Sequence, residues 1–323
     1  MKTLTKTLTH RLTAILLAMM LALSLLSACG GGEVGVNGQN GRESEITVKN
    51  PAVEIPENPA SDFEYKKDYT NFGRFGVSIT KYIGTETKVN IPKQIEGQSV
   101  IELDSDSFRG NEMITSVHIP DSVFFIEGGA FMQCSLLTDV TIPSSINFID
   151  GSMFLGCTSL TSITIPNSII EIQKDAFAAC TSLASITIPD SVVRIGDNAF
   201  QGCTSLNSIT IPDSVTDIGR VAFGGCTSLT NITIPDSITV ISGNMFIGCT
   251  SLTSITIPDS VTEIGNYAFE RCTSLTSITI PNSVAIIGNS TFDGCTSLTI
   301  RGYTGSRAEN FAAENNIPFA VLD

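Results

Sequence analysis

The sequence has 323 residues and is acidic, because 32 Asp and Glu outweigh 18 Lys and Arg to give a formal net charge of −14 at pH 7. Such a charge repels phosphate backbones and anionic lipid, which argues against a nucleic-acid partner. The chain also contains only two histidines and no tryptophan, which leaves few side chains for acid–base chemistry or for stacking on sugars.

Residues 1–28 have the layout of a secretory signal, in which basic residues precede an apolar run from Ile15 to Leu26. As a helix this run rises about 18 Å, short of the roughly 30 Å hydrocarbon core of a bilayer. The run ends in Leu-Ser-Ala-Cys, which resembles the bacterial lipobox. The resemblance implies cleavage before Cys29 and a diacylglycerol thioether, with acyl chains such as palmitate, on its sulfur. An ordinary cleavage site with an incidental cysteine is the alternative.

Residues 29–62 are expected to form a disordered tether. The stretch GGGEVGVNGQNGRE, followed by Pro51, Pro56 and Pro59, has little apolar periodicity and cannot bury enough surface to fold. Loss of residues 1–28 would change the formal charge from −14 to −17. The acyl chain, and not a basic patch, would therefore hold the protein at the membrane.

A 23-residue repeat dominates the rest of the chain. Its most regular marker is a cysteine, found at Cys134, Cys157, Cys180, Cys203, Cys226, Cys249, Cys272 and Cys295. One unit reads CTSLTSITIPDSVTEIGNYAFER, and residues 111–294 hold eight such units without an insertion or deletion. A fixed period of this length predicts a solenoid, in which each unit packs only on its neighbours.

Each unit combines two extended pieces with a turn. Ser254 to Ile257 alternate with period two and are rich in β-branched side chains, which indicates a strand. Pro258 ends its pairing because proline has no N–H, and a second extended piece follows at Val261 to Ile264. The prediction is a repeat solenoid with a β-strand plus a short turn or helical segment in every 23-residue coil.

Stacking at the roughly 4.8 Å spacing of paired strands turns each inward position into a column. One such column consists of phenylalanines, which are Phe108, Phe131, Phe154, Phe177, Phe200, Phe223, Phe246, Phe269 and Phe292.

Both ends of the array need caps, because the first and last coils would otherwise expose their apolar faces. Residues 63–110 contain a degenerate unit and are expected to be the N-terminal cap. Residues 295–323 are expected to be the C-terminal cap, with a short helix that Ser306 and Glu309 begin as a capping box.

The pattern LxxIxIPxSVxxIGxxAFxGCxSL resembles the BspA-like leucine-rich repeats of bacterial surface proteins, over about residues 73–323. It departs from the commoner leucine-rich pattern because serine replaces the usual Asn or Cys. The serines are Ser122, Ser145, Ser168, Ser191, Ser214, Ser237, Ser260 and Ser283. We expect their hydroxyls to bond to backbone groups of adjacent coils. The resemblance implies adhesion or binding of host proteins and identifies no ligand.

The cysteine column has two interpretations. Neighbouring Cα atoms near 5 Å would lie within disulfide range, and export favours disulfides. In-register side chains, however, point the same way, which favours buried free thiols that pack as small apolar groups. The ligand spacings that zinc sites need, such as C-x-x-C, are absent from the sequence.

An acidic row follows the prolines of several units and is a weak candidate for calcium. Its members are Asp190, Asp213, Asp236 and Asp259. Bound Ca²⁺ would relieve the repulsion of carboxylates about 5 Å apart, but aspartate after proline is also an ordinary turn residue. The favoured interpretation is a row of turn residues, so no metal and no other cofactor is predicted.

The outward strand positions form a nearly uniform row, named the threonine lane here. It consists of His118, Thr141, Thr164, Thr187, Thr210, Thr233, Thr256 and Thr279. His118 would be the one histidine left after export, and no motif places a nucleophile or an orienting acid beside it, so no enzymatic activity is expected. A lane of hydroxyls suits hydrogen bonding to a protein, and extended solenoid faces commonly bind partners.

Together these features predict an adhesin-like lipoprotein of the bacterial cell envelope, facing the exterior or the periplasm. Its membrane contact would be the lipid on Cys29, and its ligand a host or microbial protein bound on the solenoid face. Two other classes of function stay open. One is a structural stalk or envelope component without a dedicated ligand, and the other is a glycan-binding helper, which the absence of tryptophan disfavours.

Overall fold

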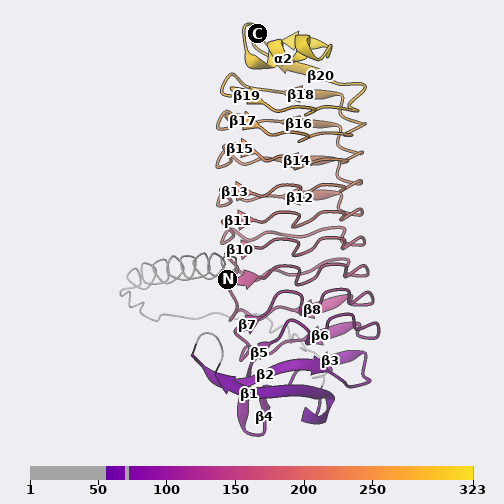
Figure 1. Ribbon diagram of the computed structural model, residues 1–323, viewed down its shortest axis with the longest axis vertical. Coiled ribbons are helices and arrows are strands. Elements are labelled where there is room, and N and C mark those ends of the chain that lie inside the picture. The colour runs from indigo at the N-terminus through magenta and orange to yellow at the C-terminus, as the bar shows by residue number, and fades with distance from the viewer. Residues whose placement is uncertain (1–55, 70–72, 323) are drawn as a thin grey trace, which may run out of the picture. The chain divides into compact units, whose positions relative to one another are not determined.

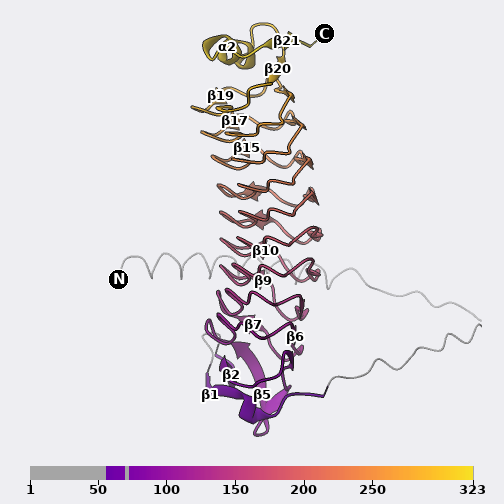
Figure 2. The ribbon, with the colours of Figure 1, turned by 90° about the vertical axis from the view of Figure 1, so that its right-hand side faces the viewer.

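The computed structural model describes residues 56–69 and 73–322, which belong to one compact unit, Glu54–Asp323. Coils of this unit stack on one another into a β-solenoid between two different ends (Figure 1; Figure 2). The predicted fold class is confirmed. Within residues 73–305 the coils contain short strands and hydrogen-bonded turns and no α-helix, so the third part of each coil is a turn.

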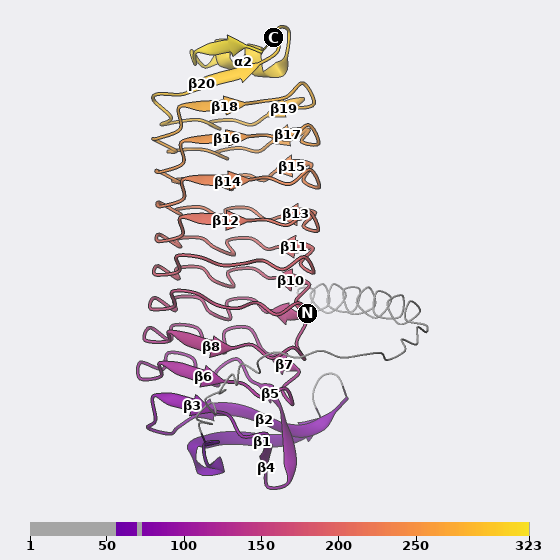
Figure 3. The ribbon, with the colours of Figure 1, turned by 180° about the vertical axis from the view of Figure 1, so that it is seen from behind.

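One side of each coil contributes to a first strand lane that runs along the stack (Figure 3). Its strands are β3 (Lys88–Asn90), β6 (Ser116–His118), β8 (Asp139–Thr141), β12 (Ser208–Thr210), β14 (Asn231–Thr233), β16 (Ser254–Thr256), β18 (Ser277–Thr279) and β20 (Thr299–Gly302). Pairing is parallel and shifted by one repeat, so that Ile209 pairs with Ile232. Isolated bridges from Thr164 to Thr187 and from Thr187 to Thr210 continue the lane where no strand is assigned.

A second strand lane follows the proline of each coil. Its strands are β7 (Phe125–Ile126), β9 (Phe148–Ile149), β10 (Glu171–Ile172), β11 (Arg194–Ile195), β13 (Asp217–Ile218), β15 (Val240–Ile241), β17 (Glu263–Ile264) and β19 (Ile286–Ile287). These strands also pair in parallel, with Ile172 opposite Ile195. In each of them the isoleucine points into the core, and the residue before it lies at least partly exposed.

The phenylalanine column fills the core. From Phe108 to Phe292, successive ring centroids lie 5.1–5.7 Å apart with interplanar angles of 2–16°. Tyr82 and Phe63 extend the stack into the N-terminal cap. At the other end Phe311 meets Phe292 edge-on, at 75° and 5.9 Å. Each ring thus buries both faces on neighbouring coils, which a single coil could not achieve.

Two hairpins build the N-terminal end, beginning with the short 3-10 helix η1 (Ala60–Asp62). Strands β1 (Phe63–Tyr69) and β2 (Phe75–Tyr82) are antiparallel, as are β4 (Gln94–Ile95) and β5 (Gln98–Leu103). The tight β4–β5 turn places Glu96 and Gly97 at φ 48° and 76°. Because β5 pairs in parallel with both β2 and β7, it joins this sheet to the second strand lane.

The C-terminal end is closed by the helix α2 (Arg307–Glu314), which lies between β20 and β21 (Phe319–Val321). The Ser306 hydroxyl accepts from the backbone N–H of Glu309 at 3.2 Å, while the Glu309 carboxylate accepts from the N–H of Gly305 at 2.6 Å. This arrangement is the expected capping box, shifted by one residue in its second bond. Ala308, Phe311 and Ala312 pack against the last coil.

The serine column behaves as expected in five coils. Ser145, Ser191, Ser214, Ser237 and Ser260 each donate to a backbone carbonyl of the preceding coil. The expectation is wrong for the other three, because the buried hydroxyls of Ser122, Ser168 and Ser283 have no hydrogen-bond partner among the described residues. Unpaired buried hydroxyls destabilise the fold, so these three coils should be less stable at this position than the five coils whose serines are paired.

The cysteine column consists of buried free thiols, which confirms the favoured interpretation. Each thiol donates to the carbonyl of the phenylalanine 26 residues earlier, as Cys226 does to Phe200 at 3.2 Å. Burial raises the pKa of all eight thiols. The smallest increase is at Cys295 in the last coil, whose pKa burial raises to about 11. The thiols therefore stay protonated and unreactive at neutral pH.

Candidate binding surface

The threonine lane lies on the first strand lane, on the outside of consecutive coils (Figure 3). His118 on β6 pairs with Thr141 on β8, and Thr210, Thr233, Thr256 and Thr279 continue along the same face. Every member is exposed except Thr279, which is partly exposed. The parallel register of one repeat places the hydroxyls at the spacing of neighbouring strands, about 4.8 Å.

The hydroxyls of the threonine lane differ from those of neighbouring threonines in their hydrogen bonds. Four threonines that directly precede the strands of the lane donate to carbonyls of the preceding coil at 3.0–3.5 Å; they are Thr138, Thr230, Thr253 and Thr276. No lane hydroxyl makes a hydrogen bond to another residue in the described part of the chain. The lane therefore has free donors and acceptors that a ligand could use.

The calcium candidates do not come together into a site. Asp190, Asp213, Asp236 and Asp259 are all exposed at turns beside the lane. Among the described residues no three acidic, histidine or cysteine side chains are arranged to hold a metal ion. The turn interpretation of these aspartates accounts for their positions without an ion.

The second strand lane carries varied side chains that the repeat pattern does not predict. Arg194 lies between Asp217 and Glu171, with N–O distances of 2.9 Å and 3.6 Å. Burial raises the pKa of Glu171 although Arg194 opposes this effect. Phe125 and Phe148 occupy the same position nearer the N-terminal end and are partly exposed. This outward position and the one before it vary from coil to coil, since only the apolar residues that flank the pair are constrained by the core.

An acidic cluster joins the N-terminal hairpins to the first coils. Lys66 on β1 contacts Asp104 at 3.0 Å, and the backbone N–H of Ser105 donates to Glu127 at 3.3 Å. Burial, with the charge of Glu127, raises the pKa of the almost fully buried Glu102. Burial also raises the pKa of Glu127, with Asp104 adding to it. Sequence reasoning missed this cluster because its members come from three separate segments.

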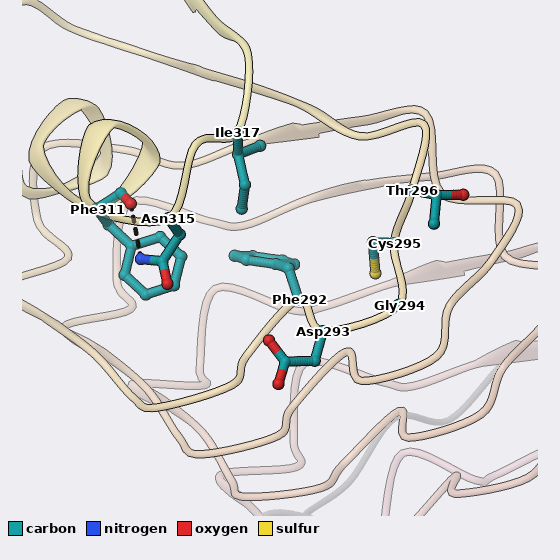
Figure 4. Close-up of a pocket in the computed structure, with 8 residues that line it drawn as sticks. All are labelled: Phe292, Asp293, Gly294, Cys295, Thr296, Phe311, Asn315 and Ile317. Atoms are coloured by element: carbon teal, nitrogen blue, oxygen red, sulfur yellow. Dashed lines mark hydrogen bonds between the residues drawn. The ribbon is translucent and has the colours of Figure 1, made fainter.

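A cavity of about 220 Å³ opens where the last coil meets the C-terminal cap. Phe292 and Cys295 from the coil and Phe311 and Ile317 from the cap supply its apolar walls (Figure 4). The exposed Asp293 and Asn315 lie at its edge. No sequence signal pointed to this cavity, which results from replacing a coil with a helix.

A family model described as the BspA-type leucine-rich repeat region matches six copies over residues 85–207 and 170–299. The chain belongs to the BspA-type leucine-rich repeat family. Comparison with curated proteins found no match. This BspA-type protein is 30% identical to a leucine-rich repeat protein from Bacteroides ovatus, with a TM-score of 0.63 and coverage of 81% of this chain and 75% of that one.

Two further solved structures are similar to this BspA-type protein at 27% identity. One is a leucine-rich repeat protein of T. pallidum, with a TM-score of 0.47 and coverage of 82% of this chain and 98% of that one. The other is a leucine-rich cell surface protein from Faecalibacterium prausnitzii, with a TM-score of 0.39 and coverage of 81% and 98%.

The predicted lipid attachment residue, Cys29, lies outside the described residues, as do residues 1–28 and most of the expected tether. In residues 56–69 and 73–322 no helix is both long and apolar enough to cross a bilayer.

Proposed function

We propose that this BspA-type protein is a lipid-anchored cell-surface protein that binds another protein through its threonine lane. The observation that carries the proposal is the difference in hydrogen bonding between the lane and its neighbours. Adjacent threonines donate across coils and so stabilise the stack, whereas the lane hydroxyls are exposed and unused. The secretory signal and the lipobox-like sequence ending at Cys29 support a place on the cell surface.

The chemistry of the lane favours a protein as the partner. Threonine hydroxyls donate and accept, so they suit the backbone amides and polar side chains of a protein surface. The acidic chain disfavours phosphate-rich ligands. A glycan would be expected to meet aromatic side chains, and the lane has none. We propose no enzymatic activity, because within residues 56–69 and 73–322 the strand neighbours of His118 are Asn90 and Thr141, and neither is a carboxylate that could orient its imidazole.

Binding is tested with a charged triple variant. Thr187, Thr210 and Thr233 are changed to arginine in the full chain, and retention of extracellular-matrix and serum proteins is compared with wild type. The control changes Thr216, Thr239 and Thr262 to arginine, which adds the same charge to three exposed threonines that directly precede β13, β15 and β17. A saturable protein partner that the first variant loses and the control retains is expected.

Retention by both variants would refute the lane as the binding face. No saturable partner at micromolar protein would favour a structural stalk without a dedicated ligand, which the uniformity of the lane across seven threonines also fits.

The anchor is tested separately with Cys29→Ser. In bacteria supplied with radiolabelled palmitate, the wild-type chain should be labelled and should enter the detergent phase on Triton X-114 partitioning. The variant should do neither. Equal labelling of the two chains would exclude Cys29 as the attachment residue, and an unlabelled wild type would support the ordinary signal-peptidase site.

A further inference from the structure

A ladder of hydrogen bonds runs through the turns of the solenoid. In every coil from Phe108 to Phe269, the N–H of the column phenylalanine and the N–H two residues later donate to carbonyls of the next coil. Phe269 donates to Thr291 at 2.9 Å and Arg271 donates to Asp293 at 2.7 Å. From the coil of Phe154 onward, the N–H two residues before the phenylalanine adds a third such bond, as Tyr267 does to Asn289. Each turn therefore offers at least two donors on one side and two acceptors on the other.

The ladder has no continuation beyond the last coil. The N–H groups of Phe292 and Gly294 donate to no acceptor among the described residues. The reason is that the next element packed on this turn is the helix α2, which contributes the ring of Phe311 in place of the backbone carbonyls of another turn. Phe311 packs edge-on against Phe292, and the space that carbonyls of a further coil would fill is left as the cavity of about 220 Å³ (Figure 4).

We propose that this cavity binds an extended segment of a partner polypeptide. Two of its carbonyls, separated by one residue, accept from the N–H groups of Phe292 and Gly294, as carbonyls of the next coil do elsewhere in the array. Strand-like addition of this kind uses unpaired backbone groups for affinity. One apolar side chain of the segment packs between Phe292 and Ile317, whose side chains face each other across the cavity.

Size and charge define the segment further. The cavity is smaller than the roughly 300–1,000 Å³ of typical small-molecule sites, so it holds only a part of the segment, which needs three residues to place both carbonyls. Asp293 is exposed at the edge and has no ion-pair or hydrogen-bond partner for its carboxylate among the described residues. With a chain charge of −14, this edge repels a free carboxylate and attracts a basic residue. The segment is therefore neutral to basic, and internal to its chain.

The repeat itself supplies a suitable probe. In the array, Ala268 and Glu270 provide the carbonyls that accept from Phe246 and Gly248 at 2.8 Å and 2.7 Å. The blocked peptide acetyl-GNYAFER-amide reproduces residues 265–271 and includes an arginine for Asp293. Amide hydrogen exchange of the full chain, followed by NMR, should show Phe292 and Gly294 exchanging faster than Phe269 and Arg271. Saturating peptide should slow exchange at Phe292 and Gly294 at least tenfold, and a scrambled peptide should not.

A variant pair locates the binding. Ile317→Trp fills the space above Phe292 and should weaken peptide binding at least tenfold, while Val321→Trp, at an exposed position of the same cap, should leave it unchanged. The proposal is overturned if the peptide does not bind at concentrations up to about 1 mM. It is also overturned if binding leaves exchange at Phe292 and Gly294 unaltered, or if both variants bind equally. The exchange measurement stands even if Ile317→Trp does not fold.

Discussion

Val221 occupies a backbone conformation that disfavours its side chain, and its replacement by asparagine should stabilise the solenoid. Its φ of 59° is in the left-handed region, which β-branched residues rarely adopt. The equivalent residues of the neighbouring coils are Asn198 and Asn244, at φ 55° and 60°. The N–H of Val221 donates to the next coil at 3.3 Å, whereas those of Asn198 and Asn244 do so at 2.9 Å.

The expected gain follows from the strain at Val221. A non-glycine residue held in the left-handed region costs on the order of 1–3 kcal/mol, and asparagine tolerates that region better than other side chains. Val221 is only half-buried, so its loss removes a minor part of the roughly 1.5–3 kcal/mol that full burial contributes. Val221→Asn should therefore stabilise the fold by about 1 kcal/mol, a rise in Tm of roughly 2–4 °C for a domain of this size.

Thermal and urea unfolding of wild type, Val221→Asn and Val221→Thr measure the effect. The threonine variant is the control, because it adds a polar group but stays β-branched and so stays strained. A higher midpoint for the asparagine variant alone is expected. The reasoning would be refuted by an unchanged or lower midpoint for Val221→Asn, or by an equal gain in Val221→Thr.

The remaining predictions concern buried hydroxyls, a buried carboxyl group and the buried thiols. Ser191→Ala should lower stability by about 1 kcal/mol, because its hydroxyl donates to Ile169 at 2.6 Å. Ser168→Ala should be neutral or stabilising, because that hydroxyl is unpaired, and equal losses in urea unfolding would contradict this. Burial raises the pKa of Glu102 above 4.5, so its contribution to stability is present at low pH and is lost as pH rises through the folded-state pKa. The free energy of unfolding of Glu102→Gln should therefore rise relative to that of wild type from pH 4 to pH 8. A difference between the two chains that stays constant with pH would exclude the effect. Finally, the column thiols, such as Cys226, should react with a thiol reagent at pH 8 only after unfolding, since burial raises their pKa; a disulfide ladder would show no thiols even then.

The repeat could be predicted from sequence because one spacing controls every inward position. A constant interval of 23 places Phe177 over Phe154 and Cys180 over Cys157, and both columns are present. The strand ended by Pro258 is β16. These features depend only on neighbours one repeat away, so a single unit contains the information that determines them.

The remaining features could not be predicted because they depend on departures from the repeat. The β4–β5 hairpin arises where extra residues follow Pro92, and the contact of Lys66 with Asp104 spans 38 residues. The repeat pattern gives Ser168 and Ser191 the same position, although Asn167 precedes the first and Asp190 the second, so it does not distinguish the unpaired hydroxyl from the paired one. The cavity needs the orientation of Phe311, which a capping signal at Ser306 does not determine. The threonine lane was placed correctly on one face, but its unused hydroxyls could be recognised only from the hydrogen bonds.

The constant register of the coils also allows the chain to misfold in whole repeats. A coil that skipped its neighbour and paired with the next one would keep its strand pairing, its ring stack and its thiol contacts, and would loop out 23 residues. What distinguishes the correct neighbour is the varied outward position, where Arg194 meets Glu171 and Asp217, and the turn where Asn198 donates to Asp175 at 2.9 Å. These weak surface contacts therefore favour pairing of each coil with its correct neighbour. An array made wholly of identical units would have no such preference.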